Sequence, residues 1–349
     1  MCSQDVDAVQ RMVPSGHAHD PRIVFSDFDE FADSIRGIAG RFIPTARSER
    51  DWWLAVAPVG GIELQQLQIG GPATYAGDGT PNTLTLGIPL TDARRIRIDG
   101  EALEANSLIY LRRDQPFTFA AGQTTRWGGI TIPLGQTSEL FDTERVMASL
   151  APATRAQSSM KHLNLLRQLL ARVGAVRNGL DQLDAAAAQS VEEDVLHAVL
   201  QTIEASSVTP ERRSGRPRVR RTRIIGDMVA LIDAKRGQPL LMNDLCKATR
   251  VSERTLRNVF MEYFGISPMR FVKTRQLLEI RRALLATDPE RGAIRRIASS
   301  FGVYDFSLLA QNYKALFGET PSESLHKPPP KRAAANASWI AHAARLSRR

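Results

Sequence analysis

The sequence is poor in cysteine and has no long apolar run. Cys2 and Cys246 are its only cysteines among 349 residues, too few for a disulfide framework or for a zinc site built from cysteine clusters. No apolar stretch approaches the roughly 20 residues of a membrane-spanning helix. The acidic N-terminal residues lack the apolar segment of a signal peptide. We therefore expect a cytoplasmic protein without membrane contact.

Histidine is absent from a long stretch of the chain. None of the six histidines lies between Phe25 and Leu134, so inward-facing histidines cannot hold a metal there. The same stretch shows no grouping of nucleophile, base and metal ligand. We expect no catalytic residues, no metal, no cofactor and no enzymatic activity, with a site made of carboxylates alone as the alternative.

Acidic residues are scarce in the C-terminal part. Residues 1–210 contain 18 basic and 25 acidic side chains, whereas residues 211–349 contain 28 basic and 12 acidic side chains. A basic surplus of this size is typical of a nucleic-acid-binding region. The two parts therefore predict a sensing or assembly unit joined to a unit that binds nucleic acid.

Short stretches of alternating polarity mark residues 21–140, after a polar tail over residues 1–20 that we expect to be disordered. Leu84, Leu86 and Ile88 alternate with less apolar residues, as in a half-buried strand. Glycine pairs separate such stretches and are typical of turns. We predict a small antiparallel β-barrel or jelly roll, within a multi-domain α+β chain.

Residues 141–206 show helical spacing instead. Apolar residues recur every three or four positions over Leu163–Leu170 and again over Val191–Ile203, which predicts two amphipathic helices. A helical pair between two domains is suited to dimerisation, so we expect a homodimer built on this segment. The alternative is that both apolar stripes pack on their own barrel.

Residues 207–223 lack apolar periodicity and carry seven arginines between Arg212 and Arg223. We predict an arginine-rich linker that lies close to DNA phosphates. Its Gly-Arg-Pro segment resembles hooks that enter the minor groove of A·T-rich DNA, and a solvated tether is the alternative. Residues 328–349 open with three prolines and predict a disordered tail.

The segment over residues 224–327 contains an internal repeat. Phe260–Pro268 is matched by Tyr313–Pro321 at an offset of 53 residues. Each copy predicts a helix, a turn and a second helix, and the second helices begin after Ser252 and Asp305 as N-caps. Two copies of one unit imply that the same task is done twice.

The second helix of each copy presents a polar outer face opposite its apolar stripe. Such a face is suited to reading the major groove of DNA. With the helix that starts at Pro268 as a spacer, the two faces are expected to read successive grooves. The candidate DNA-binding residues are Arg254, Thr255, Arg257 and Asn258 in the first copy and Phe306, Ser307, Gln311 and Lys314 in the second.

The second copy carries a specific signature. It consists of Ile297-Ala298, Gly302, Asp305-Phe306-Ser307, Tyr313-Lys314, Phe317-Gly318 and Thr320-Pro321. With it, residues 224–327 resemble the double helix-turn-helix domain of the AraC/XylS family of bacterial transcription regulators. The resemblance implies seven helices, activation of transcription, and promoter DNA and RNA polymerase as partners. By pattern and position, residues 21–140 resemble the cupin-like sensor domain of AraC-type regulators, which implies an unknown small-molecule effector.

Four positions depart from the family pattern, one of them Gln276, which replaces a common arginine in the connecting helix. Arg250 stands where the first turn often has glycine, which predicts a strained or altered turn. Asn258 and Gln311 stand where the family commonly has arginine, and both side chain types pair naturally with adenine rather than guanine. The expected guanine contact is therefore replaced by an expected adenine contact.

Aromatic residues of the predicted barrel are candidates for an effector pocket, and ordinary core is the alternative for each. They are Trp52, Trp53, Tyr75, Tyr110, Phe119 and Trp127. Arg112, Arg113 and Arg126 are either ligands of an acidic effector or solvated strand ends. Two other classes stay open: an enzymatic or small-molecule-binding barrel with an appended DNA-binding domain, and a nonspecific architectural protein.

Overall fold

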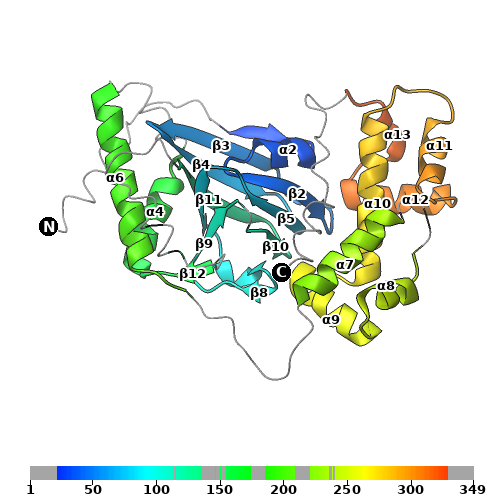
Figure 1. Cartoon of the computed structure of the whole chain (residues 1–349). Coiled ribbons are helices and arrows are strands. Elements are labelled where there is room, and N and C mark those ends of the chain that lie inside the picture. The colour runs from blue at the N-terminus through cyan, green and yellow to red at the C-terminus, as the bar shows by residue number, and fades with distance from the viewer. Residues whose placement is uncertain are drawn as a thin grey trace.

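The chain forms a β-sheet domain followed by a helical domain, and the two lie side by side (Figure 1). The computed structural model describes residues 22–113, 115–134, 155–173, 185–208, 221–235 and 240–328, together with Val146, Leu150 and Gln238. This layout confirms the predicted α+β class with an N-terminal antiparallel part and an all-α C-terminal part. None of the described helices is long and apolar enough to cross a membrane.

The N-terminal domain contains two antiparallel sheets. The larger sheet has the strand order β1-β3-β4-β11-β6-β9-β12-β13, and the smaller one has the order β2-β5-β10-β7-β8. A short helix, α2 (Phe28–Ser34), precedes β2, and a 3-10 turn, η1 (Ala93–Arg95), precedes β7. The strands are β1 (Ile23–Phe25), β2 (Ile38–Pro44), β3 (Trp52–Val59), β4 (Ile62–Ile69), β5 (Ala73–Gly79), β6 (Thr83–Pro89), β7 (Ile96–Ile98), β8 (Glu101–Ala102), β9 (Ser107–Arg112), β10 (Phe117–Ala121), β11 (Thr125–Pro133), β12 (Arg155–Gln157) and β13 (Ser207–Val208).

The larger sheet is covered on both faces. Leu84, Leu86 and Ile88 of β6 pack in one apolar cluster with helices α4 (Met160–Leu170) and α6 (Ala185–Glu204). Thr85 and Gly87 of the same strand line a cavity shared with the smaller sheet, because successive side chains point to opposite faces. The apolar alternation of β6 is observed, but the predicted half-buried strand is buried on both faces because the helices cover one face and the smaller sheet the other.

The helices α4 and α6 use their apolar stripes within their own chain. Both stripes are buried in one apolar cluster with residues of the larger sheet, and both helices lie beside that sheet (Figure 1). The buried residues are Leu163, Leu166, Leu169 and Leu170 in α4 and Val195, Leu196, Val199 and Ile203 in α6. This packing matches the alternative given for the segment, so an interface with a second copy has to use other faces of the two helices.

The linker is shorter than the predicted range of residues 207–223, because residues at both ends of that range belong to regular elements. Ser207 and Val208 form β13, the edge strand of the larger sheet, which pairs with β12. Helix α7 (Arg221–Ala234) already begins at Arg221, whose guanidinium pairs with Glu262. Residues 209–220, which hold most of the arginines, lie outside the described residues. So do the predicted tail over residues 1–20 and all but Pro328 of the tail over residues 328–349.

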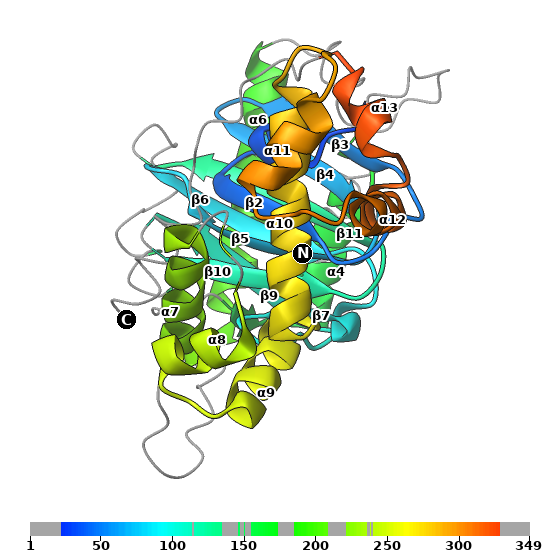
Figure 2. The same ribbon diagram turned by 90° about the vertical axis from the view of Figure 1, so that its right-hand side faces the viewer.

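Seven helices are described in the C-terminal domain. They form two apolar clusters, one around the first three helices and one around the last three. Helix α10 contributes Phe271 and Leu278 to the first cluster and Ile280 and Leu284 to the second, and it runs between the two groups (Figure 2). The helices are α7, α8 (Met242–Thr249), α9 (Glu253–Phe264), α10 (Pro268–Leu285), α11 (Ala293–Ser300), α12 (Phe306–Phe317) and α13 (Pro321–Leu325).

The helical domain packs on the smaller sheet. Ile43 of β2 and Ala76 of β5 are buried in the same cluster as residues of α7 and α9. The rings of Phe28 and Phe317 lie 6.3 Å apart across the boundary. The two domains thus share part of an apolar core, and α10 lies beside β2 (Figure 1).

Two neighbouring arginines of α10 join the domains by ion pairs. Arg281, only 5% exposed, lies 2.7 Å from the Asp27 carboxylate and 3.3 Å from that of Glu319. Arg282 donates to both carboxylate oxygens of Asp29, at 2.6 and 2.8 Å. Burial alone would lower the pKa of Arg281, but the charges of Asp27 and Glu319 outweigh it and raise that pKa. The guanidinium is therefore buried and charged.

Candidate nucleic-acid interface

The first helix-turn-helix unit consists of α8 and α9. Ser252 is the N-cap of α9, and its hydroxyl accepts from the Thr255 amide at 3.2 Å, which satisfies one amide at the start of the helix. Leu256, Phe260 and Phe264 are buried on the inner stripe, together with Val259 and Tyr263. The predicted helix, its cap and its inner stripe are all confirmed.

The outer face of α9 is open to solvent. All four residues predicted to bind DNA in this unit, Arg254, Thr255, Arg257 and Asn258, are exposed. Arg257 donates to the carboxylate of Glu253 at 2.6 and 2.8 Å, one turn back. Thr255 lies within 2.9 Å of the Ser252 hydroxyl. The structure thus brings the four side chains onto the first turns of one helix.

The second unit consists of α11 and α12 and repeats the design. Asp305 caps α12 by accepting from the Leu308 amide at 2.9 Å, and Leu309, Tyr313 and Leu316 are buried. Ser307, Gln311 and Lys314 are exposed on the outer face. Phe306 is only half-buried: it packs against the second apolar cluster, and the Arg295 guanidinium lies 5.4 Å from its ring centre.

The turns of the two units contain a left-handed residue at matching positions. In the first turn this residue is Arg250, with φ of 54°. In the second turn it is Gly302, with φ of 74°. Side chains with a Cβ are disfavoured in this region whereas glycine adopts it readily. The predicted strain in the first turn therefore corresponds to an observed backbone conformation.

Helix α10 ties the two units together. Ser267 caps it by accepting from the Arg270 amide at 3.4 Å, and Pro268 occupies its first position. Further along, the Gln276 side chain donates to the Phe301 carbonyl at the end of α11, at 2.7 Å. One continuous helix therefore contacts both units and restricts their relative position.

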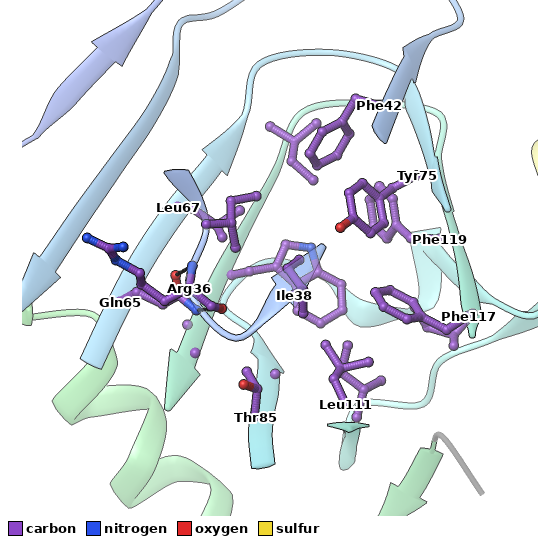
Figure 3. Close-up of a pocket in the computed structure, with 18 residues that line it drawn as sticks. Arg36, Ile38, Phe42, Gln65, Leu67, Tyr75, Thr85, Leu111, Phe117 and Phe119 are labelled. Atoms are coloured by element: carbon purple, nitrogen blue, oxygen red, sulfur yellow. Dashed lines mark hydrogen bonds between the residues drawn. The ribbon is translucent and has the colours of Figure 1, made fainter. Parts of the chain in front are cut away.

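A second site, a cavity, lies between the two sheets of the N-terminal domain (Figure 3). Of the predicted pocket aromatics, Tyr75, Phe119 and Trp127 line it. The others do not: Trp52 and Trp53 belong to the apolar core, and Tyr110 points to the α4 and α6 side, where its hydroxyl lies 2.9 Å from that of Ser206. Arg112, Arg113 and Arg126 are not among the lining residues either.

Sequence reasoning missed several residues of the cavity wall. Phe42, Phe117 and Leu111 come from β2, β10 and β9, for which no alternating pattern was identified in the sequence. Gln65 is also part of the wall, and its amide pairs with the backbone of Arg36 at 2.9 and 3.0 Å. Among the residues described, no group of three or more histidines, cysteines or carboxylates is placed to hold a metal ion.

Comparison with known proteins points to the same part of the chain as the helix geometry. Residues 245–327 match the protein family described as a helix-turn-helix domain. The chain is 33% identical over 101 residues to a probable thc operon regulatory protein of Rhodococcus erythropolis. The aligned region covers 29% of this chain and 30% of that protein. It is 28% identical over 100 residues to a XylDLEGF operon transcriptional activator of Pseudomonas putida. The aligned region covers 29% of this chain and 31% of that protein.

Among solved structures, the AraC-like transcriptional activator CuxR aligns with 74% of this chain and 94% of its own, at 12% identity and a TM-score of 0.39. The family match over residues 245–327, and not this structural likeness, makes the C-terminal domain a DNA-binding domain of the helix-turn-helix class. Its two units and its sequence relatives make it a domain of the AraC/XylS type. The chain spans about 30% of the length of the curated relatives it matches.

Proposed function

We propose that the whole chain is a sequence-specific, effector-responsive transcription regulator that acts in the cytoplasm. The observation that carries the proposal is the pair of exposed polar faces on α9 and α12, both connected through α10. Helices of this kind enter the major groove with the residues of their first turns against the base edges. The two helices would then read successive grooves of one promoter.

The chemistry of the two faces suggests how each groove is read. Arg254 and Arg257 are suited to guanine or to phosphates, whereas Asn258 and Gln311 are suited to adenine. Ser307 pairs with several bases, and Lys314 supplies a phosphate contact. Thr255 and Phe306 complete the predicted set, with Phe306 more suited to contact through its ring edge because it is half-buried.

The N-terminal domain is proposed to act as the cupin-like sensor, binding a small molecule in its cavity without converting it. Its direct packing against the helical domain, through Ile43, Ala76 and the ion pairs of Arg281 and Arg282, gives a bound effector a route to the DNA-binding units. We further propose that the regulator works as a homodimer through outward faces of the middle helices, and that it activates transcription by contacting RNA polymerase.

Footprinting on DNA upstream of its own gene and of neighbouring genes tests the proposal. We expect protection of two segments centred about one helical turn apart, because two recognition helices enter successive major grooves. An excess of random-sequence DNA should leave this protection in place. Loss of protection under that competition would instead favour a nonspecific architectural protein.

A further inference from the structure

The cavity of the N-terminal domain has an almost entirely apolar wall. It measures about 70 Å³, counted as space open to the centres of water molecules, which is several times the roughly 10–15 Å³ that one water needs. Figure 3 shows Phe42, Tyr75, Phe117 and Phe119 grouped on one side, with Leu67 across from them. These four aromatic side chains come from the smaller sheet and Leu67 from the larger one, so the two sheets form the cavity only together.

No charged group is directed at this space from the lining residues. The one charged residue among them is Arg36, whose guanidinium lies 3.7 Å from the Glu63 carboxylate and is 54% exposed. Gln65 has both ends of its amide bonded to the Arg36 backbone. Thr85 lies within 3.2 Å of the Thr131 hydroxyl. The charged and amide groups of the wall are therefore already paired.

Two polar atoms of the wall differ from these. The hydroxyl of Tyr75 and the indole N–H of Trp127 are buried and make no hydrogen bond, in side chains that are 2% and 7% exposed. Figure 3 shows the phenol oxygen of Tyr75 directed toward the interior of the cavity. Buried donors are almost always paired in folded proteins, so two unpaired donors lining one cavity indicate a ligand that accepts hydrogen bonds.

The position of Tyr75 depends on two glycines. Its ring lies over Gly40 and Gly77, where a Cβ atom would come within 2.5 Å of the ring at either position. Strands β2 and β5 place these glycines directly opposite each other. Burial strongly raises the pKa of the Tyr75 phenol, so it stays neutral and able to donate at any physiological pH.

We propose that the cavity binds a small, neutral, mainly apolar molecule of about one aromatic ring that carries a carbonyl-type acceptor, held by the Tyr75 hydroxyl and the Trp127 indole N–H. A carboxylate is disfavoured because its burial would need a cation, and the one cationic residue of the lining, Arg36, is half-exposed and paired with Glu63. This inference rests on the proposed sensor role and names the chemical class of its ligand.

The test uses calorimetric titration of the full chain with three probes of nearly equal shape: acetophenone, isopropylbenzene and benzoate. The variants are Tyr75→Phe and Trp127→Phe. Tyr110→Phe is the matched control, because this buried tyrosine is on the face of the larger sheet that meets α4 and α6, and its hydroxyl is already paired. Isopropylbenzene leaves water more readily than the ketone, so the informative quantity is the change in each affinity between parent and variant.

We expect acetophenone to bind the parent at least tenfold more tightly than benzoate. Tyr75→Phe and Trp127→Phe should each weaken acetophenone about threefold to tenfold, the usual effect of losing one hydrogen bond, and leave isopropylbenzene within about twofold. Tyr110→Phe should change neither affinity. Tyr75→Phe removes only the unpaired hydroxyl, so its thermal stability without ligand should equal or exceed that of the parent.

The proposal is overturned if benzoate binds more tightly than acetophenone, if acetophenone does not bind up to its solubility, or if both variants keep the parent's affinity for the ketone. None of these results touches DNA binding, which footprinting measures without added ligand. A failure of the ligand class is thus separable from a failure of the proposed regulator.

Discussion

The two helix-turn-helix units derive from one repeat but differ in their surroundings. The cluster around α8 and α9 includes Ile43 and Ala76 of the sheet domain, whereas the buried residues of the cluster around α11 and α12 come from the helical domain alone. The first unit is therefore packed on the sheet domain through buried core residues, whereas the second contacts that domain through the rings of Phe317 and Phe28 and is tied to it by α10. A change in the sheet domain would reach the first unit through that shared core and the second through α10 and the Phe28–Phe317 contact.

Their outer faces and turns differ as well. The first face carries two arginines and has a strained residue, Arg250, in its turn. The second face carries one cation, Lys314, and has glycine in its turn. Because Arg257 is paired with Glu253, the two faces differ less in charge than their residue types suggest, and the clearer difference is the backbone conformation of the two turns.

The largest effect is expected where α10 meets the sheet domain. Arg281→Ala leaves the largely buried Asp27 without its cation and removes one of the two cations beside Glu319, the other being Lys327. Breaking a buried ion pair from one side costs about 3–5 kcal/mol. Urea unfolding of the full chain should show a loss of that size. The control is Arg296→Ala, since Arg296 pairs with Glu290 at the surface and exposed pairs contribute about 0–1 kcal/mol. Equal effects of the two substitutions would contradict the role assigned to Arg281.

A smaller effect is expected at the recognition faces. Arg254→Ala should weaken binding to the footprinted site by about 1–3 kcal/mol and relax the base preference at one or two positions. Lys314→Ala should weaken binding to specific and random DNA alike, as loss of a phosphate contact does. Fluorescence anisotropy at fixed salt measures both.

Arg126→Ala is the control for these two substitutions, because Arg126 is exposed on β11 of the sheet domain. It should leave affinity unchanged. If Arg254→Ala also changed neither affinity nor preference, α9 would not be the recognition helix of the first unit.

Exchanging the turn residues tests the difference in strain. Arg250→Gly should raise the free energy of unfolding by about 1 kcal/mol, because glycine adopts the left-handed region without the cost that other residues carry. Gly302→Arg should lower it by about 1–2 kcal/mol for the same reason. Thermal unfolding measures both. Lys247→Gly, inside α8, is the control and should be destabilising by about 1 kcal/mol, as glycine is in a helix interior.

The smallest effect is a pH dependence at Glu319. Burial alone would raise its pKa, but hydrogen bonds from Lys327 and Ser324 and the charge of Arg281 lower it below its ordinary value of 4.5. A carboxyl with a lowered folded-state pKa stabilises the fold above pH 4.5, and this contribution is lost as the pH falls through the folded-state pKa.

The stability difference between parent and Glu319→Gln should therefore be constant near neutral pH and shrink in acid below pH 4.5. Glu290→Gln, at an exposed position, serves as the control in the same urea titrations. A difference that grew in acid would have the wrong sign for this arrangement.

The sequence alone determined the local structure of the helical domain. Helix starts depend on residues within one turn, so Ser252, Ser267 and Asp305 could be recognised as caps before any contact was known. The repeat then set the inner and outer faces of α9 and α12, because the 3.6-residue period assigns each residue to a face. Arg250 could be recognised as unusual because its counterpart in the second copy is glycine.

Only the tertiary structure decided what lies against each face. Alternation identified the two sides of β6 but not which would meet α4 and α6, since the period of two says nothing about the neighbouring layer. Arg281 looks like a solvated helix residue in sequence, and its partner Asp27 lies 254 positions away along the chain. Tyr75 and Trp127 line one cavity only because β5 and β11 belong to sheets that face each other. Such juxtapositions come from the packing of distant segments, which no local pattern encodes.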